Sequence, residues 1–298
     1  MEKSIYDIIT LELMDNMIEE YGMRRFSKAL PACPALLNLR LDYNEFGDAG
    51  CQHLCEGLAG NETMLSLSLN YCGLTAKSAR CLGHMIATTA LRDVFLDGND
   101  LGCAGAEQIL LPLVAKAEAE LQERKQAEEA KLAAEAALKA AEEEAKANRF
   151  ARGASPPPTP TPAPEKKSKK KKGKKKGKKA PPPPPAPGAW VHKLHLADNG
   201  IDGFNEGLGE FQSIQCMKLF RRLIASSECL QELDLEDNYI GDIGGNQLLD
   251  ALIERKQVNS LPGIKLQTTH RMHTNTLKDL IKYGAGNIKK KKGKKKKK

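Results

Sequence analysis

Aromatic residues are scarce in this chain of 298 residues, which contains a single tryptophan, Trp190. Aromatics make up 5% of the sequence and hydrophobic residues 41%, so any core must be built from aliphatic side chains. Long apolar runs are missing too, since no stretch approaches the roughly 20 apolar residues of a membrane-spanning helix. The opening "MEKSIYDIITLELMD" mixes acidic with apolar residues, unlike a secretory signal. We therefore expect an intracellular protein.

Signatures of common catalytic and nucleotide-binding sites are also absent from the sequence. Neither a glycine-rich phosphate loop, nor GxSxG, nor HExxH occurs, and the six histidines are scattered. We therefore expect no enzymatic activity, no cofactor and no small-molecule substrate.

The eight cysteines include no CxxC pair, and their tightest arrangement is "CQHLC", with Cys51, His53 and Cys55. On a helix, Cys51 and Cys55 share one face, so a metal site is conceivable. Two small buried side chains on a core-facing helix are the favoured interpretation, and no metal is predicted. Reduced, buried cysteines are typical of a cytosolic protein.

Positive charge is concentrated in two short segments. Residues 166–179 hold 11 lysines and residues 289–298 hold 9, which leaves 26 basic against 38 acidic residues elsewhere. The sequence is thus an acidic body with two basic segments, a pattern that favours acidic partners. Both segments lack arginine and interleaved aromatics, so they suit diffuse negative charge better than base recognition. Contacts with acidic surfaces are predicted for Lys169, Lys170, Lys171, Lys172, Lys174, Lys175, Lys176, Lys289, Lys290, Lys291, Lys292, Lys294 and Lys295.

Five segments share the pattern L-x-x-L-x-L-x-x-N/C-x-L with aliphatic substitutions. They begin at residues 36, 64, 91, 191 and 230, and a weaker sixth copy begins at 261. Alternating aliphatic residues predict a short strand with one buried face. The asparagine that follows can satisfy backbone groups at a turn, and apolar residues at helical spacing then predict a returning helix.

This pattern resembles the leucine-rich repeat family, and the spacing of about 28 residues resembles its ribonuclease-inhibitor-like subclass. The resemblance implies an α/β solenoid with short parallel strands inside and helices outside. We assign residues 36–116 to repeats 1–3, residues 190–273 to repeats 4–6 and residues 274–285 to a C-terminal capping helix. Residues 1–35 are predicted to form an N-terminal helical cap, with helices within 4–30.

An interval of 100 residues separates the third and fourth copies and indicates an insertion near 117–189. Its first part, 117–150, consists almost entirely of helix-forming residues and predicts an extended Ala/Glu/Lys helix. Large aliphatics are too few there for a strong coiled coil, so an arm docked on another protein and a solvated helix both remain open. The Pro/Lys-rich segment 151–189 is predicted to be disordered, and 286–298 forms a polybasic tail.

The concave face of the solenoid and its turns are the predicted partner-binding surface. Acidic residues recur in the turns and would align into a ridge, although a solvated loop edge is the favoured explanation for them. Phe95 occupies an outward strand position with Tyr43 and Tyr71 at adjoining repeats, and such aromatic anchors are typical of protein-binding faces. The alternatives are that a capping segment covers Phe95 or that an exposed aromatic is merely tolerated there. The predicted partner-binding residues are Arg40, Asp42, Tyr43, Tyr71, Phe95, Asp97, His195, Asp198, Asp234 and Glu236.

Leucine-rich repeats combined with Lys/Gly/Pro/Ala-rich segments resemble axonemal proteins of flagellated algae and protists, including the nexin–dynein regulatory complex. The resemblance implies a scaffold in the cytoplasm, at the cytoskeleton of the cilium or flagellum, with axonemal coiled-coil subunits and tubulin as partners and no membrane contact. A nuclear or nucleolar adaptor with RNA- or DNA-contacting lysines is one alternative. Regulation of a small GTPase is another, although the turns contain no arginine to supply to a GTPase.

Overall fold

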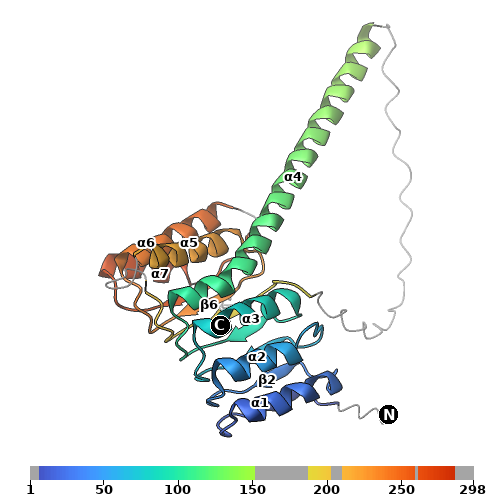
Figure 1. Cartoon of the computed structure of the whole chain (residues 1–298). Coiled ribbons are helices and arrows are strands. Elements are labelled where there is room, and N and C mark those ends of the chain that lie inside the picture. Colours follow the sequence, from blue (N-terminus) through green and yellow to red (C-terminus); the bar gives the residue numbers. More distant parts are fainter. Residues whose placement is uncertain (1–6, 152–186, 203–209, 259–260, 286–298) are drawn as a thin grey trace, which may run out of the picture. The chain divides into compact units, whose positions relative to one another are not determined.

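The computed structural model describes residues 7–151, 187–202, 210–258 and 261–285. Within them, seven strands form one parallel sheet in the order of the sequence (Figure 1). The strands are β1 (Thr10–Glu12), β2 (Asn38–Arg40), β3 (Ser66–Ser68), β4 (Asp93–Phe95), β5 (Lys193–His195), β6 (Glu232–Leu235) and β7 (Lys265–Thr268). The helices are α1 (Glu20–Phe26), the 3-10 helix η1 (Ser27–Ala32), α2 (Gly47–Gly57), α3 (Ala76–Thr88), α4 (Gly102–Ala151), α5 (Glu210–Ser226), α6 (Asp242–Gln257) and α7 (Thr274–Tyr283).

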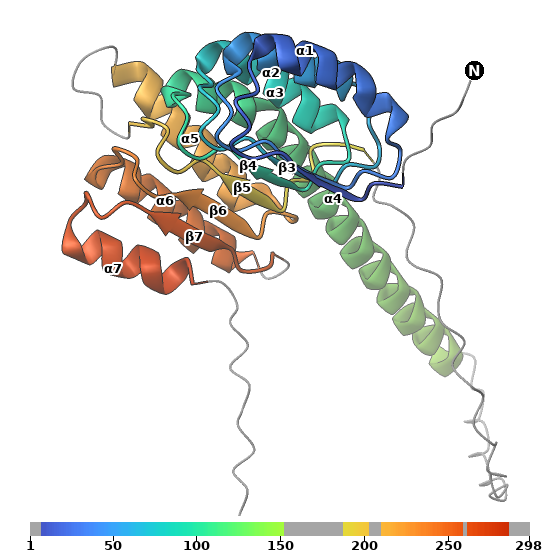
Figure 2. The ribbon, with the colours of Figure 1, turned by 90° about the horizontal axis from the view of Figure 1, so that it is seen from below.

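The core of the repeats lies between the sheet and its helices. Strand partners align residue for residue, so Leu39 pairs with Leu67 and Leu67 with Val94, and all three are fully buried. Alternate residues of each strand point to the opposite face, which the helices leave uncovered (Figure 2). This uncovered face is the concave face. Outward side chains at the same position of successive strands line up in columns across it.

The insertion falls between two neighbouring repeats, as predicted. Val94 of β4 pairs with Leu194 of β5, so the sheet continues in register across 100 residues of sequence. The chain divides into two compact units, one of residues 1–121 and 185–298, which we call the repeat body, and one of residues 122–184. Helix α4 includes residues 117–150, which the sequence predicted to form an extended helix. The side chains of α4 from 125 to 144 are exposed. None of the described helices is long and apolar enough to cross a membrane.

The N-terminal segment corrects the predicted helical cap. Residues 10–12 form strand β1, which pairs with β2, and helix starts only at Glu20. The residues Ile8, Leu11, Leu13, Asn16 and Ile18 follow the repeat pattern and lie 28 positions before their counterparts in the next copy. The prediction failed because the aliphatic residues of this segment also fit the spacing of a helix. A strand of three residues shows too little alternation to distinguish a strand from a helix in the sequence.

Buried asparagines join successive turns. The side-chain oxygen of Asn44 accepts from the backbone N–H groups of Asn16 and Ile18, both at 3.0 Å, and its amide donates to Leu41 O at 2.7 Å. Asn99 and Asn238 repeat this arrangement. Each amide therefore satisfies the backbone of its own turn and of the preceding one, which fixes the turns that border the concave face.

Candidate functional site

A cluster of carboxylates surrounds His195 at the middle of the concave face. The ring nitrogens of His195 lie 3.8 Å from an oxygen of Asp97, 3.8 Å from Glu232 and 3.7 Å from Asp234. The ring also packs edge-on against Phe95, with centroids 4.7 Å apart. These five residues, which we call the His195 cluster, come from β4, β5 and β6 and from the turn after β4. The parallel register brings them together although 100 residues separate Phe95 from His195 in the sequence.

The backbone holds the acidic members of the His195 cluster in place. Asp97 accepts a 2.8 Å hydrogen bond from the backbone N–H of Ala197, which leaves its other oxygen toward His195. Asp234 is 7% exposed and accepts from the backbone N–H of Glu236. Glu232 pairs with Lys265 of β7. A fixed set of carboxylates in a half-buried setting attracts cationic groups more strongly than the same charges would in open solvent.

The environment shifts the pKa values within the His195 cluster. Burial alone would lower the pKa of His195, but the nearby carboxylates of Asp97, Asp234 and Glu232 raise it above the usual value. Burial raises the pKa of Asp234, although the nearby His195 opposes that change. The site therefore favours a protonated histidine, which offsets part of the negative charge around it.

Two stacked tyrosines lie at the turn edge of the repeats before the insertion. The rings of Tyr43 and Tyr71 are 5.0 Å apart and nearly parallel at 4°, and they are 53% and 42% exposed. Tyr71 also lies over Gly98, where an added Cβ would come within 2.1 Å of the ring. Glycine at position 98 thus allows the ring to lie flat against the next turn, and the pair forms an exposed apolar platform.

The structure brings four of the ten predicted partner-binding residues into one cluster: Phe95, Asp97, His195 and Asp234. Asp42 is instead buried at 1% exposure, where it accepts from Ser68 Oγ at 2.6 Å and from Arg40 at 3.3 Å. Its predicted role as a contact residue is therefore wrong, because its carboxylate is used between β2 and β3.

The remaining predicted contact residues are not members of the His195 cluster. Asp198 and Glu236 are exposed at the turns, and Arg40 is exposed beside Glu12, 3.6 Å away. The site list from the sequence missed Glu232, although its outward strand position was recognisable from the repeat register. The thirteen predicted lysine contacts lie in 166–179 and 289–298, outside the described residues.

The pair Cys51 and Cys55 gains a third thiol in the structure. Cys81 of α3 joins them from the next repeat, and the three Sγ atoms all lie within 4.8 Å of one another. His53 is not part of this group, because its ring faces Glu56 at 3.5 Å. Cys51 and Cys55 are buried, as the packing interpretation expected, but Cys81 could not be joined to them without knowing how successive helices align.

Comparisons with known proteins agree with this architecture. A family model described as "Leucine Rich repeat" matches residues 226–248. The fold is a leucine-rich repeat solenoid. Ribonuclease inhibitors from Sus scrofa and Mus musculus are similar to this repeat protein, at 40% identity over 98 residues and 34% over 102 residues. These matches cover 32% and 34% of this chain and 22% of each relative.

A third relative, a Tonsoku-like protein from Danio rerio, is 34% identical over 113 residues, which is 35% of this chain and 8% of that protein. The chain spans about a fifth or less of the length of the curated relatives it matches. The predicted ribonuclease-inhibitor-like character of the repeats is therefore supported.

Proposed function

We propose that this leucine-rich repeat protein is a non-enzymatic scaffold that binds a basic segment of a partner protein on its concave face. The His195 cluster is the observation that carries the proposal, because it combines three carboxylates with the half-buried ring of Phe95. Lys265 pairs with Glu232, whereas Lys193 pairs with Asp93 at 3.1 Å, outside the cluster. Among the described residues, Asp97 and Asp234 are therefore the cluster carboxylates that no lysine pairs with. The named function of the ribonuclease inhibitors, which act on another protein, also supports a protein partner.

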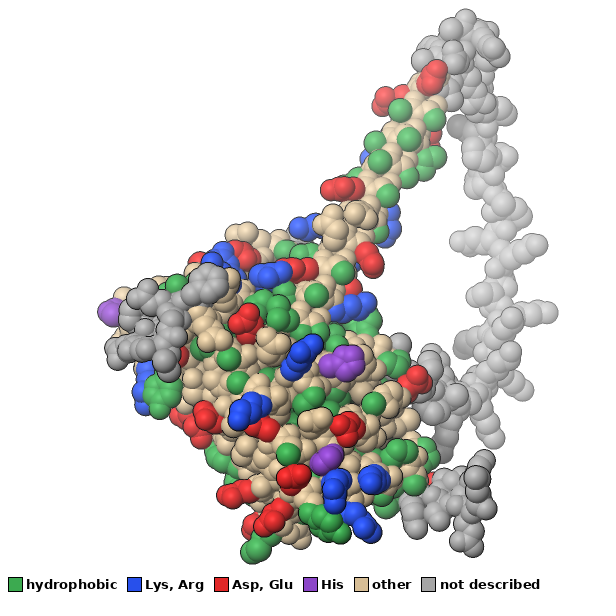
Figure 3. All heavy atoms as spheres, in the orientation of Figure 1, with side chains coloured by type: hydrophobic (Ala, Val, Ile, Leu, Met, Phe, Trp, Pro, Cys, Tyr) green, Lys and Arg blue, Asp and Glu red, His purple; other side chains and the backbone are tan. Residues whose placement is uncertain are grey.

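The face of the described repeats that the helices form lacks such a concentration of acidic side chains. Figure 3 shows acidic and basic side chains interspersed over the helices of the repeat body, with small apolar side chains between them. A surface of mixed charge favours solubility over attraction to a partner of one sign. The concave face is accordingly the better candidate for recognition.

We place this scaffold in the axoneme of a cilium or flagellum, among coiled-coil subunits of a dynein-regulatory or linker complex. Support comes from the combination of two lysine-rich segments with an excess of acidic residues in the rest of the chain, which suits an assembly whose tubulin surfaces are acidic. In this role the concave face holds a neighbouring subunit, while the lysines of 166–179 and 289–298 contact tubulin.

Carboxylate-to-lysine crosslinking followed by mass spectrometry on the native assembly tests the concave face. We expect Glu232 and Glu236 to crosslink to lysines of one partner. Substitution Phe95→Ala, combined with Glu232→Gln, should weaken that partner's binding at least tenfold. Leu111→Ala on α4, which removes a 43% exposed apolar side chain from the helical side, is the matched control and should leave binding unchanged. Crosslinks confined to the helical face would contradict the proposal.

Localisation and salt dependence test the axonemal placement. A tagged chain should copurify with isolated axonemes, whereas confinement to nuclei would favour the nuclear adaptor. Deletion of 289–298 should weaken binding to microtubules and reduce its dependence on salt, because fewer cations contact the acidic surface. Equal binding with and without the tail would rule out an anchoring role for these lysines, and acceleration of GTP hydrolysis across a panel of small GTPases would favour the regulatory alternative.

A further inference from the structure

Three cysteine sulfurs meet between two neighbouring helices on the side of the repeats opposite the His195 cluster. Cys51 and Cys55 lie one turn apart on α2, and Cys81 lies on α3 of the next repeat. Their Sγ atoms all lie within 4.8 Å of one another, and no other group of three potential ligands of this kind occurs in the part of the chain that the structure describes. We call these residues the thiol triad.

The dimensions of the thiol triad approach those of a metal–thiolate site. Zinc–sulfur bonds are about 2.3 Å long, so three sulfurs around one ion lie roughly 3.8–4.0 Å apart. The triad would have to contract by less than about 1 Å, which small rotations of the side chains can supply. Cys51 is fully buried and fixes one corner, while the less enclosed Cys81 offers the freedom that ligation requires.

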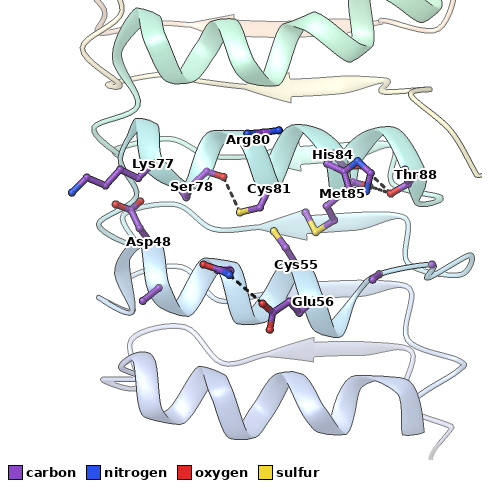
Figure 4. Close-up of a pocket in the computed structure, with 14 residues that line it drawn as sticks. Asp48, Cys55, Glu56, Lys77, Ser78, Arg80, Cys81, His84, Met85 and Thr88 are labelled. Atoms are coloured by element: carbon purple, nitrogen blue, oxygen red, sulfur yellow. Dashed lines mark hydrogen bonds between the residues drawn. The ribbon is translucent and has the colours of Figure 1, made fainter.

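An open groove connects the thiol triad with solvent. The groove has a volume of about 870 Å³ and is lined by both helices, including Cys55 and Cys81. In Figure 4 the sulfurs of Cys55 and Cys81 point toward one another across the gap between α2 and α3. Lys77 and Arg80 line the groove together with Asp48 and Glu56, so the groove carries both signs of charge. An ion can therefore enter, and a water molecule can occupy a fourth position.

Ion binding by the thiol triad is coupled to the loss of its thiol protons. Thiolate is the form of cysteine that ligates metals, so a bound ion would displace these protons to solvent. Cys81 donates to Ser78 O at 2.9 Å, and this proton would be among those released.

We propose that Cys51, Cys55 and Cys81 form a binding site for a thiophilic d10 cation, Zn(II) or Cu(I), that joins two successive repeats. Three thiolates suit both ions, which differ in whether a fourth ligand is added. The site rests on the three sulfurs and the groove, and it is independent of the partner-binding role of the concave face.

A second thiol pair provides an internal comparison. Cys103 of α4 approaches Cys216 of α5, and the hydrogen bond from Cys216 lowers the pKa of Cys103 to about 7. The Cys103 sulfur also donates to Asp202 O at 3.1 Å, much as Cys81 donates to Ser78 O at 2.9 Å. Because this pair has only two sulfurs, serine at Cys103 is a matched control for serine at Cys81, and each hydroxyl can keep its hydrogen bond to the carbonyl.

X-ray absorption of the reduced, untagged full chain loaded with Zn(II) or Cu(I) tests the proposal. We expect one ion per chain with three sulfur neighbours at roughly 2.3 Å, plus one oxygen for Zn(II). Competition titration should show that Cys81→Ser weakens binding at least tenfold, whereas Cys103→Ser leaves it unchanged. Circular dichroism of both variants checks that the fold persists, and Cys55→Ala replaces Cys81→Ser if that variant unfolds.

Several results would overturn the proposal. Binding of both ions no tighter than to a cysteine-free peptide would do so, as would fewer than three sulfur neighbours in the wild-type spectrum, which requires no variant. Equal affinities of Cys81→Ser and Cys103→Ser would show that Cys81 does not ligate the ion, whether both bind like the wild type or both bind more weakly. A spectrum with three sulfurs for one ion and none for the other identifies which of the two cations the site takes.

Discussion

Before the insertion, helices α2 and α3 meet through the sulfurs of the thiol triad, whereas after it helices α5 and α6 meet through charged side chains. Arg221 of α5 lies 3.2 Å from Gln247 and 3.3 Å from Asp250, and it also pairs with Glu254. The strands of both regions are nearly identical in length and pairing. The leucine pattern thus determines the strand side of each repeat, while the contacts between helices vary freely from one repeat to the next.

Helix length explains part of this difference. Helices α2 and α3 contain 11 and 13 residues, whereas α5 and α6 contain 17 and 16. Longer helices present side chains beyond the core that the strands provide, and polar pairs suit such positions. The end of α5 also needs partners for its last carbonyl groups, which the buried side chain of Arg255 supplies.

Replacement of Arg255 by methionine should have the largest effect on stability. Its guanidinium donates to the carbonyl oxygens of Ile224, Ser227, Leu230 and Pro262, at 2.6 to 3.3 Å, and the residue is 3% exposed. Arg255→Met leaves these buried carbonyls without charged donors, which should lower the free energy of unfolding by about 3 kcal/mol. Urea denaturation followed by circular dichroism measures the change.

The control for Arg255→Met is Arg221→Met on the neighbouring helix. The side chain of Arg221 is 32% exposed, so its ion pairs contribute less than about 1 kcal/mol. Similar losses for the two variants would show that the exposed charges, and not the buried guanidinium, hold α5 and α6 together.

Replacing the buried turn asparagine should cost more stability in the last repeat before the insertion than in the first repeat after it. Asn99 accepts from Cys72 N and Leu74 N, both at 3.1 Å, and Asn99→Ala should cost about 2 kcal/mol. Among the described residues, the side-chain oxygen of Asn199 has no hydrogen-bond partner, so Asn199→Ala should cost only about 1 kcal/mol. Hydrogen exchange of the two turns measures both changes, and equal protection losses would contradict this ranking.

The His195 cluster connects the two regions and should make their junction sensitive to pH. Because its folded-state pKa is raised above 6.5, protonated His195 contributes stability that is complete below the unfolded value and disappears as pH rises through the folded value. The stability difference between wild type and His195→Gln should therefore be larger in mildly acidic than in mildly alkaline solution. An NMR titration should give a His195 pKa above the usual range, and Asp97→Asn should lower it.

Two exposed tyrosines should show the smallest effects. Tyr43 and Tyr239 are both 53% exposed, but Tyr43 stacks on Tyr71, whereas Tyr239 lies 4.6 Å beneath the guanidinium of Arg271. Substitution by leucine should cost roughly 0.5–1 kcal/mol at either position, from lost stacking or lost cation–π contact. High salt should reduce only the Tyr239→Leu effect, and thermal unfolding at two salt concentrations tests this difference.

The sequence predicted most of the strands and their pairing, because the spacing of the leucines encodes both directly. The aligned residues Leu39, Leu67, Val94, Leu194 and Leu233 all face the core, and pairing across the insertion followed from matching Val94 with Leu194. The first repeat was missed because its strand is short and its aliphatic residues also fit a helix.

The candidate site was less accessible to sequence reasoning because it depends on contacts between repeats. The outward position of Phe95 followed from alternation, but the burial of Asp42 depends on Ser68, 26 residues away. Cys81 likewise joins Cys51 only through the alignment of α2 with α3. Neither relation leaves a pattern within one copy of the motif.

The unbroken register between β4 and β5 has a consequence for how this chain can change. Closing a loop costs entropy only as the logarithm of its length, so extending one connection from about 28 to 100 residues costs roughly 1 kcal/mol. This cost applies to one connection only, so the stability of the other repeats does not change. The β4–β5 connection is therefore an exchange point, where a foreign helix, sensor or tether can be grafted while both flanking repeats keep their partners.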